Sequence, residues 1–257
     1  MKSSATLNHA DQQALLSRKI SELPLDGQAT HLRELILRLY KELEAAGLSF
    51  KPKTYLSNSW GCPNGVPVIG IPFFLADPVL TRLQTQMTGK KAQDDAAIMK
   101  LLRHEAGHTF NYAYRLYDEP DWETLFGPFS LPYRDEYEAD PSSTRFVRHL
   151  ARCYAQKHPD DDFAETFAVW LTPRSNWRTA YAGTPALEKL LYVDRVVADY
   201  GKRPPIVTSG RLDMPVEEMG MTLGEWYRMI YRNRGKRVGR ATPGAQKGCR
   251  QGTRRSG

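Results

Sequence analysis

The sequence is poor in cysteine and has no long hydrophobic run. Its three cysteines, Cys62, Cys153 and Cys249, are isolated and odd in number among 257 residues. This excludes a disulfide framework and a Cys-x-x-Cys zinc knuckle, and it favours a reducing compartment. No run of about 18 or more apolar residues could span a membrane, and the first residues lack the pattern of a secretory signal. We therefore expect a soluble, cytoplasmic protein without a membrane partner.

Acidic residues are missing from the end of the chain. Nine Lys or Arg residues and no Asp or Glu lie between Arg232 and Gly257. The rest of the chain has 27 basic and 29 acidic residues, a net charge of −2, so the net charge of +7 comes from the tail. The tail could bind nucleic acid by releasing counterions, but it has no aromatic residue for base stacking. We expect residues 233–257 to form a disordered basic tail, and we do not expect nucleic acid as a partner.

The rest of the composition, with 41% hydrophobic and 11% aromatic residues, is typical of a folded protein. Residues 1–29 are polar and predict a loosely ordered segment, whereas residues 30–232 predict one mainly helical α+β domain. Short apolar runs broken by proline and glycine between Ser49 and Leu75 indicate a small sheet. Apolar periodicity and capping residues predict helices over 30–46, 78–87, 92–117, 146–156, 160–171, 186–200 and 223–232.

The helix predicted over 92–117 contains His104-Glu105-Ala106-Gly107-His108. Two histidines four residues apart lie one turn apart on one face of a helix, so both imidazoles can bind one metal ion. Glu105 is offset around the helix and can direct its carboxylate to a metal-bound water. Ala106 and Gly107 are small and allow another element to approach closely. The pattern favours zinc over its structural alternative, two core histidines held by ordinary hydrogen bonds.

A catalytic zinc needs a third protein ligand. Asn111 and Tyr114 stand where the metzincin pattern requires glycine and histidine, so this ligand lies further along the chain. Glu136, in a Glu-x-x-x-Asp sequence that we expect to be loop, and Glu165, in a predicted helix, are the two candidates. We favour Glu165 because a carboxylate among core residues is buried without a partner unless it meets a cation, and its neighbours are Phe163, Phe167 and Trp170. The alternative is a half-exposed Glu165 that binds nothing.

These residues resemble the gluzincin-type zinc metallopeptidases, in particular a group of bacterial zinc-binding metallopeptidases. The HEAGH sequence and the later DDDFAETFA are similar to the paired motifs of the anthrax lethal factor catalytic domain and the Mlc titration factor peptidase. The resemblance implies a zincin-like fold, in which a small sheet with an edge strand packs on the HExxH helix beside a second, ligand-bearing helix. It also implies that His104, His108 and Glu165 are the zinc ligands and that Glu105 is the catalytic glutamate.

The resemblance has one departure and leaves two details open. Val169 stands where thermolysin has an aspartate, so we expect Asp162 or Asp161 to orient a ligand instead. The edge strand of such a fold can pair with an extended substrate, and residues 66–71 are the candidate. A simple hairpin is the alternative for that segment.

The function implied is hydrolysis of a peptide bond, with Zn²⁺ as cofactor and Glu105 as general base. A tyrosine or histidine often stabilises the oxyanion in such sites, and Tyr154, His158 and Tyr137 are the candidates, Tyr154 first. The expected partner is a peptide or protein substrate. The alternative is a non-catalytic zinc-binding regulatory or binding protein on the same fold, which would not need a glutamate at position 105.

Overall fold

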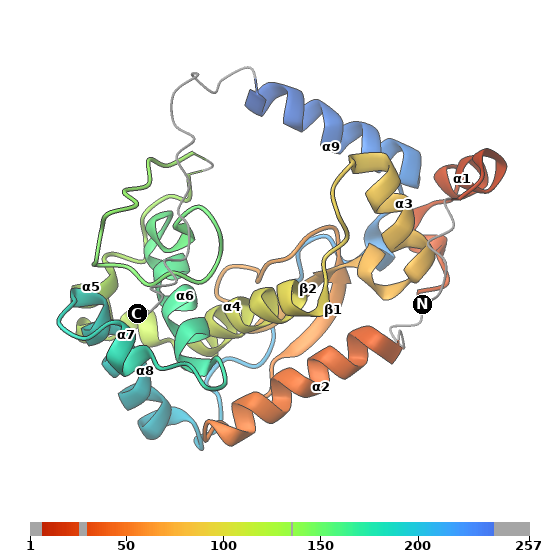
Figure 1. Cartoon of the computed structure of the whole chain (residues 1–257). Helices are drawn as coiled ribbons and strands as arrows, with labels where there is room; N and C mark the ends of the chain where they lie inside the picture. Colours follow the sequence, from red (N-terminus) through yellow and green to blue (C-terminus); the bar gives the residue numbers. More distant parts are fainter. Residues whose placement is uncertain (1–6, 26–29, 135, 239–257) are drawn as a thin grey trace.

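The computed structural model describes residues 7–25, 30–134 and 136–238. This part of the chain is mainly helical with a small parallel sheet, an α+β arrangement (Figure 1). Its helices and strands are α1 (His9–Leu16), α2 (Thr30–Ala45), β1 (Lys53–Ser57), β2 (Val68–Pro72), α3 (Pro78–Thr88), α4 (Asp95–Tyr114), α5 (Pro120–Phe126), α6 (Pro159–Leu171), α7 (Trp177–Ala180), α8 (Pro185–Tyr200) and α9 (Leu223–Val238). None of the helices within these ranges is long and apolar enough to cross a membrane.

Most helices begin at the residues that the sequence indicates. The Asp94 carboxylate accepts a hydrogen bond from the Ala97 amide at 2.9 Å and caps α4. Thr222 and Glu225 form the predicted capping box at the start of α9. The helices predicted over 30–46, 78–87, 92–117, 160–171, 186–200 and 223–232 are confirmed as α2, α3, α4, α6, α8 and α9. Side-chain caps satisfy backbone N–H groups that the first turn of a helix cannot, so such residues mark helix starts reliably.

The sheet consists of β1 and β2 in parallel, with Lys53 opposite Val68 and Ser57 opposite Pro72. All five residues of β2 are buried, and on its other side Gly70 exchanges two backbone hydrogen bonds with Gly61. Gly61 thus pairs with one residue of the segment on the side where the sequence analysis expects an extended substrate, and pairing of residues 66–71 with a substrate stays a prediction. The sheet packs against α4, as expected.

Helices α4 and α6 cross at the centre of the fold (Figure 1). Their approach depends on Gly107, because a Cβ atom there would lie 2.7 Å from the Cα atom of Ala164 and 3.0 Å from its carbonyl oxygen. The predicted close contact at Gly107 is thus confirmed. Around it lies the largest apolar cluster, which includes Leu39 of α2, Ile69 of β2, Leu102, Phe110, Phe163, Phe167 and Val193 of α8. This cluster fixes the position of the two central helices.

A second apolar cluster joins the early residues to α9. Ile20 is completely buried and belongs to one cluster with Phe73 and Trp226, and its amide donates to the Met221 carbonyl at 3.0 Å. Residues 7–25 therefore pack against the domain, where the sequence suggests a loosely ordered segment. The cause is that a few apolar side chains among polar ones anchor this segment without producing a periodic pattern.

The prediction of a helix over residues 146–156 is wrong. Residues 127–134 and 136–153 contain no helix or strand, and one 3₁₀ turn, Tyr154–Gln156, precedes α6. Arg152 has φ of +65° and the following residue φ of +53°, which ends any right-handed helix. Side chains take the place of helical acceptors, since the Leu150 amide donates to Glu165 Oε2 at 2.8 Å. Tertiary partners therefore override the helical propensity of this segment.

The C-terminal helix α9 continues to Val238, past the predicted end at 232. The rest of the predicted basic tail, residues 239–257, lies outside the described residues. Disorder of that tail therefore stays a prediction.

Candidate metal centre

Two histidines of α4 and one aspartate of α6 converge between the central helices. The Nε2 atoms of His104 and His108 lie 3.1 Å apart. Asp161 Oδ1 lies 3.6 Å from the Nε2 atom of His104 and 3.5 Å from that of His108. All three side chains are buried, and their ligand atoms form a compact group that could hold a metal ion. The four-residue spacing on α4 and the first turn of α6 create this arrangement.

The other nitrogen of each imidazole faces a second carboxylate. His104 Nδ1 lies 2.9 Å from Glu165 Oε1, and His108 Nδ1 lies 2.8 Å from Asp160 Oδ2. An ionised carboxylate can only accept a hydrogen bond, so each Nδ1 atom carries the hydrogen. This fixes the tautomer of both rings and leaves each Nε2 lone pair directed to the space shared with Asp161.

When both imidazoles are neutral, three acceptor atoms point at one another: the two Nε2 atoms and Asp161 Oδ1. At distances of 3.1–3.6 Å these atoms repel one another unless a proton or a metal cation lies between them. In a tetrahedral zinc site with bonds of about 2.0–2.1 Å, ligand atoms lie about 3.3–3.4 Å apart. The spacing of the group matches that geometry, and the outer oxygen of Asp161, Oδ2, is buried without a hydrogen-bond partner. The residues present fit a zinc ion.

The electrostatics of the site also favour positive charge at this point. Burial lowers the pKa of His104, but hydrogen bonds to Asp161 and Glu165 outweigh it and raise this pKa to about 9. Burial opposes the charge of His108 too, and Asp160 raises the pKa of that imidazole well above its usual range. The two imidazolium groups in turn hold the pKa of Asp161 below its usual range, against the effect of burial. The carboxylates around the imidazoles thus stabilise a cation, whether protons or a metal.

The structure places Glu165 beside the metal-ligand group and not within it. Glu165 is fully buried, and both of its oxygens are occupied: Oε1 by His104 and Oε2 by the Leu150 amide at 2.8 Å. The competing candidate, Glu136, is exposed. The burial expected for Glu165 from its apolar neighbours is found, but the cationic partner that it meets is an imidazole.

Asp161 takes the position that the sequence analysis expects of Glu165. It lies one turn before Glu165 on the same face of α6, so both carboxylates reach the histidines at different heights along the helix. Asp162, the other residue considered for an orienting role, instead pairs with Lys189, Nζ to Oδ2 at 2.5 Å, and both are buried. Burial raises the pKa of Asp162 to about 7, although Lys189 acts in the opposite direction.

Asp160 is a site residue for which the sequence gives no separate signal. Its Oδ2 atom accepts hydrogen bonds from Tyr112, at 2.5 Å, and Tyr133, at 3.2 Å, in addition to its contact with His108. Its Oδ1 atom accepts from Asn111 at 2.9 Å. Three donors besides His108 thus hold the Asp160 carboxylate, which in turn orients His108.

The carboxylate of Glu105 forms no hydrogen bond with either imidazole. The side chain is buried, and the Cys62 thiol donates to its Oε2 atom at 3.5 Å and to its backbone oxygen at 3.4 Å. Burial and the neighbouring Glu105 raise the pKa of Cys62 well above its usual range, so the thiol keeps its proton. Glu105 therefore retains lone pairs for a further donor such as water.

Of the three candidates for the oxyanion, Tyr154 lies nearest to the histidines. Its ring packs edge-on against His104, with 5.5 Å between the ring centres, and its hydroxyl oxygen accepts a hydrogen bond from Lys157 Nζ at 3.2 Å. Since the oxygen accepts, the hydroxyl hydrogen stays available to a substrate. Tyr137 donates its hydroxyl to the Arg152 carbonyl at 2.8 Å.

His158 has a structural role at the start of α6. One ring nitrogen, Nδ1, accepts from the Asp160 amide at 3.1 Å and caps the helix, and Nε2 lies 2.7 Å from the Leu131 carbonyl. Both nitrogens are therefore occupied, and Tyr133 stacks on the ring with 3.9 Å between the centres. The structure does not bring His158 to the metal-ligand group.

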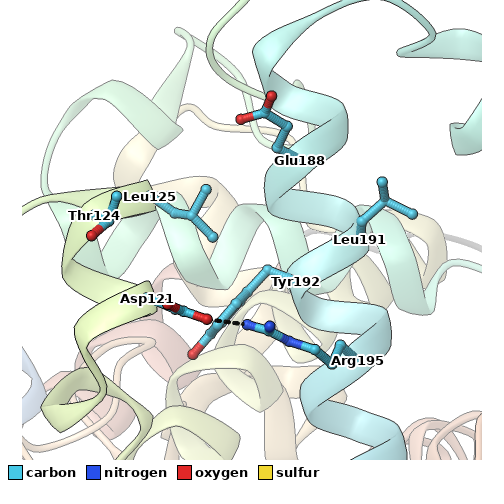
Figure 2. A pocket seen from close by; sticks show the side chains of 7 residues that line it. All are labelled: Asp121, Thr124, Leu125, Glu188, Leu191, Tyr192 and Arg195. Carbon is cyan, nitrogen blue, oxygen red and sulfur yellow. Dashed lines mark hydrogen bonds and ion pairs between the residues drawn. The ribbon is translucent and has the colours of Figure 1, made fainter.

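A surface pocket lies elsewhere, between α5 and α8 (Figure 2). Asp121 of α5 and Arg195 of α8 bridge it with an ion pair of 2.6 Å. The remaining residues of its wall are Thr124, Leu125, Glu188, Leu191 and Tyr192. Its lining contains no histidine or cysteine and none of the residues predicted for the site, so this pocket is separate from the group of His104, His108 and Asp161 that could hold a metal ion.

Comparison with known proteins agrees with this chemistry. Residues 58–229, more than half of the chain, match the model of a family described as "Putative zinc-binding metallo-peptidase". The matched range contains β2, both central helices and the start of α9. No curated protein and no solved structure matches the sequence.

Proposed function

Because the chain belongs to this family of zinc-binding metallo-peptidases, we propose that it hydrolyses peptide bonds with a zinc ion held by His104, His108 and Asp161. The observation that carries the proposal is the convergence of two bare Nε2 atoms and one carboxylate oxygen within 3.1–3.6 Å, on a helix pair of which one member carries HExxH. Two imidazoles and one carboxylate are a common ligand set of catalytic zinc sites, which leave a fourth position open.

Glu165 and Asp160 serve as positioning residues in this proposal. Each accepts the Nδ1 hydrogen of one zinc histidine, which orients the ring and increases the basicity of its Nε2 atom. Glu165 would be a poor direct ligand, because turning either oxygen to a metal would break its bond to His104 or leave the half-buried Leu150 amide without its acceptor.

When bound, zinc polarises the scissile carbonyl and lowers the pKa of a water molecule. Glu105, adjacent to His104 and free of a strong hydrogen bond, accepts the proton of the attacking water and delivers it to the leaving nitrogen. Tyr154 donates its free hydroxyl hydrogen to the developing oxyanion. The burial of the group keeps bulk water out and strengthens these interactions.

The test is peptide hydrolysis by the purified, zinc-loaded protein on a degenerate peptide library, with products identified by mass spectrometry. Glu105→Gln keeps the size of the side chain and removes its basicity, so we expect kcat/KM to fall by a factor of about 10²–10⁴ with zinc content unchanged. Glu123→Gln, an exposed glutamate of α5, is the matched control and should keep wild-type activity.

The outcomes distinguish a zinc peptidase from a non-catalytic zinc-binding protein. Cleavage that survives Glu105→Gln would contradict the proposed mechanism and point to a contaminating protease. Stoichiometric zinc without cleavage of any library member would favour a non-catalytic zinc-binding protein on the same fold.

A further inference from the structure

Lys157 places an ammonium group against two tyrosines that contact the residues of the candidate metal centre. Its Nζ atom donates to the Tyr154 hydroxyl at 3.2 Å. It also lies 5.1 Å from the centre of the Tyr154 ring and 5.2 Å from that of Tyr133. Cation–π contacts at these distances hold an ammonium group with little loss of its charge.

The two tyrosines link Lys157 to both zinc histidines. Tyr154 packs against His104, whereas the Tyr133 hydroxyl reaches Asp160, the carboxylate that holds His108. The ammonium group is therefore separated from His104 by one side chain, Tyr154, and from His108 by two, Tyr133 and Asp160.

Lys157 is half-buried, and its ammonium group forms no ion pair with any acidic side chain of residues 7–25, 30–134 and 136–238. By contrast, Lys189, a fully buried lysine near α6, is paired with Asp162. A partly desolvated ammonium group without a carboxylate carries a cost that an incoming anion relieves.

We propose that Lys157 binds a carboxylate of the peptide substrate, either the chain terminus or an Asp or Glu side chain, and so selects substrates that carry a negative charge near the scissile bond. This inference rests on the proposed peptidase function. The contact would be a charge-assisted hydrogen bond, and Lys157 has donor hydrogens besides the one that Tyr154 accepts.

The acidic residues of the site make this selection specific. Glu105, Asp160 and Asp161 are buried around the imidazoles and repel a carboxylate that approaches in another register. A negatively charged substrate group can bind only where the Lys157 ammonium group offsets its repulsion by these carboxylates. Lys157 would therefore determine both which peptides bind and how they are placed.

The experiment measures peptide binding without turnover. Zinc-loaded protein carrying Glu105→Gln is incubated with two synthetic decapeptide libraries, one with free C-terminal acids and one with C-terminal amides, and retained peptides are identified by mass spectrometry. The same selection is repeated after adding Lys157→Gln. Lys41→Gln, which removes an exposed charge from α2, is the matched control.

We expect peptides with the recognised carboxylate to be enriched about tenfold over their neutral counterparts, as one hydrogen bond to a charged group implies. Enrichment that persists in the amide library and follows Asp or Glu identifies a side-chain carboxylate, whereas enrichment confined to the free acids identifies the terminus. Lys157→Gln should abolish either preference, and Lys41→Gln should leave it unchanged. Equal retention of charged and neutral peptides, or a preference that survives Lys157→Gln, overturns the inference.

These outcomes are separate from the test of the proposed function. If the wild-type protein cleaves the library but shows no preference for carboxylates, the proposed peptidase function stands and the proposed role of Lys157 is wrong. If the protein shows a carboxylate preference that depends on Lys157 but cleaves no peptide, the binding site stands and the proposed peptidase function is wrong.

Discussion

The substitution Gly107→Ala tests how closely the metal centre depends on the packing of α4 against α6. The added Cβ atom would lie 2.7 Å from the Cα atom of Ala164 and 3.1 Å from the Cβ atom of Phe167. Carbon atoms in contact are normally about 3.5–4.0 Å apart, so α6 would have to move by about 1 Å. The atoms of Ala164 concerned belong to the backbone and cannot rotate away.

The expected effect has two parts of opposite sign. Overpacking of this kind costs about 1–3 kcal/mol, whereas replacing glycine by alanine within a helix gains about 1 kcal/mol. We expect a net loss of up to about 2 kcal/mol, and a fall in Tm of up to about 8 °C for a domain of this size. Because the displacement of α6 carries Asp161 away from His104 and His108, zinc affinity should also fall by about tenfold or more.

Differential scanning calorimetry of the zinc-free protein and competition with a chelator of known affinity measure the two effects. Adding Ala164→Gly is the informative control, since it removes a side chain but leaves the clashing backbone atoms in place. It should not restore zinc affinity. A Gly107→Ala protein with an unchanged or higher Tm and wild-type zinc affinity would refute the reasoning.

Three further predictions address other parts of the site. Tyr154→Phe should lower kcat by about 10²-fold with unchanged zinc content, as loss of an oxyanion donor does; unchanged kcat in steady-state assays would exclude the role. Glu165→Gln should weaken zinc binding by about 10–100-fold without abolishing it, as measured by chelator competition. Lys189→Met should destabilise the protein by about 3–5 kcal/mol at neutral to alkaline pH, because it leaves Asp162 buried without a cation. Burial already raises the pKa of Asp162 to about 7, so the protonated form dominates below that pH and the loss should grow as pH rises; a loss independent of pH in urea unfolding would contradict this.

The sequence predicts the zinc helix and its partner because local rules define both. Periodic apolar residues and the Asp94 cap define α4, and acidic residues followed by an apolar stretch define α6. The small Gly107 even indicates where the helices touch. These features depend on residues within a few turns of one another.

The role of each carboxylate depends on how far α6 is shifted along α4, which no local pattern contains. Asp161 and Glu165 share one face of α6. A shift of α6 by one turn, about 5.4 Å, would bring Glu165 to the level along α4 that Asp161 occupies. In the structure Asp161 faces the Nε2 atoms and Glu165 faces the Nδ1 atom of His104. For the same reason no local pattern predicts the surroundings of Asp160 and Lys157, both of which contact Tyr133 of the 127–134 loop.

The wrong prediction of a helix over 146–156 also has its origin outside local patterns. Leu150 lies in a segment with helical propensity, but its amide donates to a side chain of α6. A partner on another element therefore decides the conformation of this segment.

The most direct test of the account is zinc content per chain, measured by inductively coupled plasma mass spectrometry on the wild type, Asp161→Ala and Glu165→Gln after dialysis against trace zinc. We predict about one zinc per wild-type chain, none in Asp161→Ala, and a reduced but saturable content in Glu165→Gln. Zinc retained in Asp161→Ala and lost in Glu165→Gln would contradict the proposed ligand set. A wild-type protein that takes up no zinc would contradict the metal centre itself.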